Sequence, residues 1–225
     1  MPDPHASAGA TSRLVDRRFD VRYVGPISGC YTLSDRRELG NAGVEVYACR
    51  TQSISAAAAA ITAPVTGVAG EWVTARFDHI GIVRGQIERL TPDGFVFQIN
   101  ISDEERQKLA LKITWLKRKS VRLQEDKREF RRFQPRDPRS TLTLADGAVI
   151  KCFVIDLSRN GAALSAHQRP AVGVPVVIGK LKSHVVRHLE IGFAVAFEAA
   201  QDAEGLEQLV TGIGLNATVP AGIWS

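Results

Sequence analysis

Guanidinium groups crowd one stretch of this 225-residue chain, between residues 117 and 139. Within it Arg132 and Arg136 form an Arg-x-x-x-Arg motif, and Arg131 stands beside the first of the pair. A guanidinium is planar and permanently charged, so it can pair with two phosphate oxygens or with guanine O6 and N7, and it can stack on a base. Prolines at 135 and 138 break any continuous basic helix, which makes the stretch a basic loop. Arg128 and Arg132 have the same spacing, but we prefer the later pair because its Arg-Arg-Phe-x-x-Arg context also occurs near the start of the chain.

A second polar motif, Asp156-x-Ser158-x-x-Gly161, follows the arginines. The carboxylate of Asp156 can accept hydrogen bonds from the Watson–Crick edge of guanine, and the hydroxyl of Ser158 can donate or accept. Gly161 suits a turn that needs positive φ, or a close approach of the backbone to a ligand. Alone, an arginine-rich loop is usually a solvated linker, and this second motif is usually only a turn. Their occurrence together, in this order, predicts a binding site.

An internal repeat organises the rest of the chain. The segment 49–63 aligns without gaps on 152–166, so that Cys49 pairs with Cys152 and Ser55 with Ser158. The other matches are Arg17-Arg18-Phe19-x-x-Arg22 with Arg131-Arg132-Phe133-x-x-Arg136, Gly70 with Gly173, Val83-Arg84 with Val186-Arg187, and GFVFQI (94–99) with GFAVAF (192–197). Because these features keep their order, we predict two copies of one domain.

Each copy has the pattern of a small antiparallel β-barrel or sandwich. Short β-branched and apolar runs flank turn signals such as Asp146-Gly147, which is typical of a hairpin. Five alanines at 56–60 would favour a helix by propensity, but the repeat places them on a turn and the following strand.

One helix is predicted near the end of each copy. In the first copy, Leu109, Ile113 and Leu116 have helical spacing after a possible N-cap at Ser102 or Asp103. A shorter helical pattern occupies about 201–211 in the second copy. The expected organisation is a disordered leader (1–13), a first copy (14–118), a basic linker (119–131), a second copy (126–212) and a C-terminal tail (213–225).

With these motifs in place, residues 128–198 resemble the PilZ family, whose signature is RxxxR before a β-barrel and [D/N]xSxxG on its surface. The resemblance implies an all-β fold of two tandem barrels and a receptor for cyclic di-GMP that regulates motility, exopolysaccharide or biofilm formation without being an enzyme. We further expect the ligand to draw the arginines onto the barrel and change the arrangement of the domains. The ligand contacts that it implies are Arg131, Arg132, Arg136, Asp156, Ser158 and Gly161.

The first copy lacks half of this site. Arg18 and Arg22 satisfy the first motif and Ser55 is retained, but Ser53 stands in place of the aspartate and Ala58 in place of the glycine. Without the acidic acceptor, guanine recognition should be weak. We therefore predict that the first copy binds no nucleotide and serves as a surface for a protein partner or a homodimer.

The composition limits the possible partners, the location and the state of the cysteines. The net charge of +5 and pI near 9.3 favour an anionic partner, without choosing among nucleotide, nucleic acid and membrane surface. No apolar run approaches the ~18–20 residues that span a bilayer, and the N-terminus has no secretion signal, so the expected location is the cytoplasm. Three cysteines without a CxxC pair predict reduced thiols, with Cys49 and Cys152 buried.

Neither a cofactor nor a metal site is expected. His184 and His188 fall on a predicted strand, where their spacing separates the Cα atoms by roughly 13 Å. No GxSxG, GxxxxGK[ST] or HExxH motif occurs, which makes an enzyme the least favoured class. Two alternatives stay open: a PilZ-like interaction module that no longer binds nucleotide, and a nucleic-acid binder that uses the basic loop.

Overall fold

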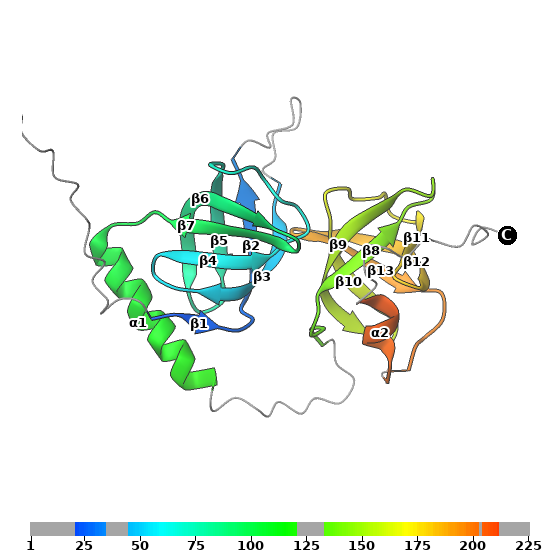
Figure 1. Cartoon of the computed structure of the whole chain (residues 1–225). Coiled ribbons are helices and arrows are strands. Elements are labelled where there is room, and N and C mark those ends of the chain that lie inside the picture. The colour runs from blue at the N-terminus through cyan, green and yellow to red at the C-terminus, as the bar shows by residue number, and fades with distance from the viewer. Residues whose placement is uncertain (1–20, 35–44, 121–132, 203, 212–225) are drawn as a thin grey trace, which may run out of the picture.

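The computed structural model describes residues 21–34, 45–120, 133–202 and 204–211. The predicted leader, the tail and residues 121–131 of the predicted linker lie outside this part of the chain. Two β-barrels stand side by side, each with a helix, as the colour run from blue to red shows in Figure 1. The predicted fold of two tandem antiparallel barrels is thereby confirmed.

The first barrel is a closed ring of six strands with one short strand added to it. Going round the ring the order is β3-β2-β5-β6-β7-β4, and β4 pairs back onto β3, while β1 pairs with the Ser53–Ile54 end of β3. Its strands are β1 (Tyr23–Val24), β2 (Ser28–Leu33), β3 (Tyr47–Ile54), β4 (Ala58–Thr62), β5 (Trp72–Phe77), β6 (Gly81–Thr91) and β7 (Gly94–Ile99). The alanine run therefore forms a strand, as the repeat predicted and helix propensity did not.

The second barrel has the same ring order, β9-β8-β11-β12-β13-β10, which confirms that the chain contains two copies of one fold. Its strands are β8 (Arg139–Thr143), β9 (Val149–Ser158), β10 (Gly161–Ser165), β11 (Pro175–Ile178), β12 (Leu181–Leu189) and β13 (Gly192–Phe197). Asp146 and Gly147 form the predicted β8–β9 turn, with Gly147 at φ 84° and the Asp146 carboxylate accepting the Ala148 N–H.

Irregularities in the strands fix the equivalence of the two copies. Gly70 and Gly173, with φ 87° and 88°, donate their N–H groups to Ile87 and Val185 at 2.8 Å in both cases. In each copy a β-bulge follows the acceptor residue, between Ile87 and Arg89 in β6 and between Val185 and Arg187 in β12. Arg89 is therefore the equivalent of Arg187. The predicted match of Val83-Arg84 with Val186-Arg187 is therefore wrong. The β5–β6 hairpin is longer than the β11–β12 hairpin, which shifts the alignment.

Two helices close the barrels. In α1 (Asp103–Ser120), Leu109, Ile113 and Leu116 are buried in the first core, as predicted. Ser102 caps this helix: its hydroxyl accepts the Glu105 N–H at 3.3 Å, and the Glu105 carboxylate accepts the Ser102 N–H at 3.0 Å. The Ser102 hydroxyl also donates to the Glu105 carboxylate at 2.8 Å, and this bond, together with the one from the Ser102 N–H, lowers the pKa of Glu105. The short α2 (Leu206–Val210) buries Leu206 and Val210 in the second core.

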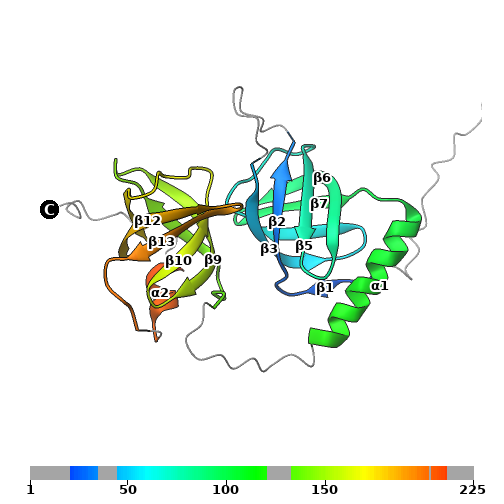
Figure 2. The same cartoon turned by 180° about the vertical axis from the view of Figure 1, so that it is seen from behind.

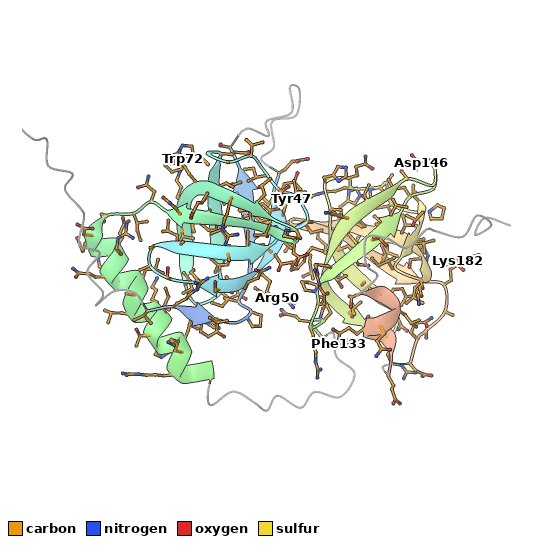
Figure 3. The ribbon with its side chains drawn as sticks, viewed as in Figure 1. Tyr47, Arg50, Trp72, Phe133, Asp146 and Lys182 are labelled. Atoms are coloured by element: carbon orange, nitrogen blue, oxygen red, sulfur yellow. The ribbon has the colours of Figure 1, made fainter. Side chains whose placement is uncertain are left out.

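The barrels meet through equivalent strands, β3 and β9. Arg50 of β3 is 6% exposed, lies 5.9 Å from the centre of the Phe153 ring, and donates from Nη1 to the Pro135 carbonyl at 2.6 Å. Its Nε is buried and has no hydrogen-bond partner within the described residues. Burial lowers the pKa of the guanidinium, and the negative charges of Glu207 and Asp137 act in the opposite direction. Figure 3 shows Arg50 and Phe133 on the side where the two barrels face each other.

Two arginines of the second barrel also bridge to the first. Arg139 forms an ion pair with Asp93 at 2.5 Å. Arg169 donates to the carbonyls of Val46 in the first barrel and of Glu190 in the β12–β13 turn, at 3.0 and 3.3 Å. Figure 2 shows this β12–β13 hairpin reaching toward β2 and β3. The segment 135–139 and the β12–β13 hairpin thus both take part in the contact between the barrels.

Candidate functional site

The Asp-x-Ser-x-x-Gly motif covers the end of β9, a tight turn and the start of β10. The Ser158 hydroxyl donates to the Gly161 carbonyl at 3.1 Å, which holds the turn closed. The first copy has the same turn, in which the Ser55 hydroxyl donates to the Ala58 carbonyl at 3.3 Å. Ser158 therefore has a structural task in addition to any contact with a ligand.

A surface pocket of about 380 Å³ lies against this turn. Its walls come from the outer face of β9, β10, β12 and β13. The residues that line it are Asp156, Ser158, Asn160, Gly161, Ala162, Val186, Arg187, Ala194, Val195 and Ala196. The structure therefore brings together three of the residues that the sequence singled out, namely Asp156, Ser158 and Gly161.

Strand register arranges the pocket in rows that run across the strands. In one row Asp156 faces Ala163, Ala163 faces Ala194, and Ala194 faces Arg187. Neighbouring strands lie about 4.8 Å apart, so Asp156 and Arg187 are separated by about 14 Å across the sheet. The pocket thus has an acidic end and a basic end with small side chains between them.

The next row follows the same plan, with Ser158 facing Gly161, Gly161 facing Ala196, and Ala196 facing His184. His184 is exposed on β12, as expected for a surface histidine. The floor of the pocket between the motif and β12 is therefore made of glycine and alanine.

Gly161 is required by its neighbouring strand rather than by its φ angle. It is not among the described glycines with positive φ. A Cβ atom on Gly161 would lie 2.1 Å from the Val195 carbonyl oxygen and 3.3 Å from the Ala196 Cα. The positive φ offered from the sequence therefore does not account for this glycine, whereas an approach of its backbone to a ligand stays a prediction. The close pairing of β10 with β13 accounts for it.

Of the three predicted arginines, only Arg136 lies within the described residues. It is exposed, does not line the pocket, and donates its backbone N–H to the Glu207 carboxylate at 2.6 Å. Phe133 and Leu157 exchange backbone hydrogen bonds of 2.8 Å, and the chain then runs antiparallel to β9 until the Val154 N–H bonds to the Pro138 carbonyl. The residues after Phe133 therefore lead away from Ser158, toward the contact between barrels.

Register also shows which arginines of the two copies correspond. Tyr23 pairs with Ile54 in the first copy as Phe133 pairs with Leu157 in the second. Tyr23, and not Phe19, is therefore the equivalent of Phe133, which makes Arg22 the equivalent of Arg132.

Arg22 has a direct partner in the first copy, because its Nη2 donates to the Ser53 hydroxyl at 2.6 Å. Ser53 occupies the position that Asp156 holds in the second copy, since each follows the bulged residue of its strand. An arginine placed one residue before the bridging aromatic thus reaches the position of the motif acid. In the sequence, the counterpart of Arg22 is therefore Arg132, and the arginine four residues before it is Arg128.

The first copy has a different surface where the second has its pocket. Val96 and Gln98 of β7 take the places of Ala194 and Ala196, and Ala58 takes the place of Gly161. The first copy therefore has larger side chains where the second has alanines, and it also lacks the carboxylate, because Ser53 stands in its place. This gives a second physical reason for the predicted lack of nucleotide binding in the first copy.

Sequence reasoning missed two polar residues that line the pocket, Asn160 and Arg187. Asn160 lies within the motif turn, where its position between Ser158 and Gly161 could have drawn attention. Arg187 comes from β12, and only its place after a bulge in the register reveals it. Among the residues that the structure describes, no group of three His, Cys, Asp or Glu side chains could hold a metal ion.

No family model matches the sequence, and no curated protein sequence matches it. Solved structures with a similar course of the chain include PlzA of Borreliella burgdorferi in complex with c-di-GMP, the Bacillus subtilis inhibitor of motility MotI/DgrA, and YcgR of Escherichia coli in complex with c-di-GMP. In that order their identities are 9%, 11% and 11%, and their TM-scores are 0.28, 0.24 and 0.22. The alignments cover 81%, 84% and 82% of this chain and 85%, 93% and 80% of theirs. At these low scores the functional argument rests on the residues of this chain.

None of the helices in the described residues has the length and apolar character needed to cross a membrane.

Proposed function

We propose that the chain is a receptor for cyclic di-GMP, which binds in the pocket of the second barrel. The observation that supports this most is the convergence of Asp156, Ser158 and Gly161 on one pocket beside the strand segment that follows the arginine-rich loop. The residue that follows the arginine-rich loop, Phe133, thereby pairs with Leu157 on the strand that carries Asp156 and Ser158. The protein acts by binding and not by catalysis, and the family resemblance implies an output in motility, exopolysaccharide or biofilm formation.

The chemistry of the pocket suits a guanine dinucleotide. The Asp156 carboxylate can accept hydrogen bonds from the N1 and N2 donors of guanine, which adenine does not offer in that pattern. Arginine side chains supply planar forks for the phosphates and for guanine O6 and N7. Alanine and glycine on the floor leave room for a flat base to lie against the sheet.

The arginines that approach Asp156 are assigned from the equivalence of the two copies. Arg132 immediately precedes Phe133, just as Arg22 precedes Tyr23, and Arg22 already bonds to the residue at the acid position. We therefore assign the first contact to Arg132. The second arginine of the pair is Arg128 by the spacing of the first copy. The roles proposed for Arg131 and Arg136 stay predictions.

Ligand binding is expected to change the arrangement of the barrels, because the segment after the motif arginines is shared with the contact between them. The Pro135 carbonyl, three residues after Arg132, accepts the hydrogen bond from buried Arg50 of the first barrel. Arg139, further along the same segment, pairs with Asp93. When a dianionic ligand draws the arginines onto the second barrel, the segment moves with them. The hydrogen bond to Pro135 and the ion pair of Arg139 then change, and with them the arrangement of the barrels. The ligand shifts the arrangement only by its different affinity for the two forms.

The test is a calorimetric titration of the full chain with cyclic di-GMP, and with cyclic di-AMP as the matched control. We expect binding of the guanine ligand only. Asp156→Ala and Arg132→Ala should each weaken it by roughly 10- to 150-fold, the equivalent of one charge-assisted contact of about 1.5–3 kcal/mol. Ser53→Ala, at the same position of the first copy, should leave the affinity unchanged. Absence of heat with cyclic di-GMP at high micromolar concentration would refute the proposal and favour an interaction module.

A further inference from the structure

Arg187 lines the pocket and has no partner among the residues that the structure describes. It is exposed, and within the described part of the chain it makes no hydrogen bond or ion pair. Arg159, on the turn of the motif, behaves differently: its guanidinium donates to the Gln201 carbonyl at 3.1 Å and pairs with Asp202 at 3.4 Å. Of these two arginines near the pocket, only Arg187 therefore has its full set of donors available.

A β-bulge directs Arg187 toward the pocket. The register of β12 against β13 shifts between Val185 and Arg187, so that Val186 is the extra residue. Val185 is completely buried in the core, whereas Val186 is 41% exposed, and both Val186 and Arg187 line the pocket. Bulges re-aim side chains in this way and are common beside binding sites. Without it, strict alternation along the strand would have turned Arg187 into the core.

Building on the proposed function, we infer that Arg187 is a further ligand-binding residue, which holds the end of the dinucleotide opposite Asp156. The Cα atoms of the two residues belong to one row of the sheet and lie about 14 Å apart, so a ligand that both side chains contact must reach across the alanines between them. A ligand with two bases and two phosphates meets this requirement, with one guanine at Asp156 and a phosphate or the other guanine at Arg187.

The small residues between Asp156 and Arg187 belong to the same proposed site. Ala194 and Ala196 stand on β13 between the motif and Arg187, and in the first copy Val96 and Gln98 replace them although Arg89 occupies the position of Arg187. An arginine at the bulge is thus present in both copies, but only the second copy has an open floor beside it. The floor decides whether the arginine and the acid can act on one ligand.

The experiment compares Arg187→Ala, Arg187→Lys and Arg159→Ala in calorimetric titrations of the full chain with cyclic di-GMP. We expect Arg187→Ala to lose about 10- to 150-fold in affinity, the equivalent of one charge-assisted contact. Arg187→Lys should recover only part of this loss, because lysine keeps the charge and lacks the planar fork. Arg159→Ala, the matched control, should stay within about threefold of the wild type, as expected for an arginine that is already paired.

A second variant tests the floor independently. Ala194→Val introduces the first copy's residue into the second barrel at an outward position, and it should lower affinity while the thermal transition stays in place. The outcomes separate the two proposals. If the wild type does not bind cyclic di-GMP, the proposed function fails. If the wild type and Asp156→Ala behave as proposed but Arg187→Ala binds like the wild type, the inference about Arg187 alone is wrong.

Discussion

Replacement of Gly161 by alanine separates a structural role from a ligand contact. The added Cβ would lie 2.1 Å from the Val195 carbonyl oxygen and 3.2 Å from its carbonyl carbon, and both are backbone atoms that cannot rotate away. Strands β10 and β13 must therefore move apart. Over-packing of this kind costs about 1–3 kcal/mol. The lower part of that range is expected, because the first copy accommodates Ala58 in the equivalent strand pair.

For a domain of this size, a loss of about 1 kcal/mol lowers the transition temperature by about 4–8 °C. We therefore expect the thermal transition temperature of the second barrel to fall by roughly 4–16 °C in Gly161→Ala, as followed by circular dichroism. Urea unfolding should show the matching loss in the free energy of unfolding. The reciprocal change in the first copy, Ala58→Gly, should cost only about 0.5–1 kcal/mol, the usual penalty of glycine in a strand. A Gly161→Ala protein that lost ligand affinity at an unchanged transition temperature would refute this reasoning, because it would show that the glycine acts through the ligand.

Two further predictions concern buried groups. Arg50→Ala leaves the buried Pro135 carbonyl without its donor, which should lower the free energy of unfolding by about 1–3 kcal/mol and increase the radius of gyration in solution scattering; no change in either quantity would contradict the contact. Only Cys30 should react with a thiol reagent in the native protein at pH 8, because Cys49 and Cys152 are buried and burial raises their pKa, that of Cys152 to about 12. Burial also raises the pKa of Cys30 and slows its reaction, and two or three reactive thiols without denaturant would contradict the described packing.

Local patterns predicted much of the fold. The repeat assigned the alanine run at 56–60 to a strand, and helical spacing after Ser102 located α1, because both signals depend on residues that are close in sequence. The gathering of Asp156, Ser158 and Gly161 was equally accessible, since they belong to one turn.

The features that escaped prediction depend on pairings between distant strands. Arg187 joins the pocket through two strand pairings and a bulge, and the need for Gly161 comes from a carbonyl of β13. The predicted match of Val83-Arg84 with Val186-Arg187 was wrong because the two hairpins differ in length. Such a difference shifts the alignment of the two copies without changing the alternation of apolar residues along the strand. Burial of Arg50 against the second barrel has no signal in its own strand, where a charged residue would normally be placed in solvent.

The most direct test of the account is a titration of isotope-labelled protein with cyclic di-GMP, followed by backbone amide resonances. The account predicts that the largest shifts fall on 156–161, on 186–187 and on 194–196, while the equivalent positions 53–58 and 96–98 of the first barrel stay unchanged. Shifts centred on the first barrel, or none at saturating ligand, would contradict a binding site on the outer face of the second barrel.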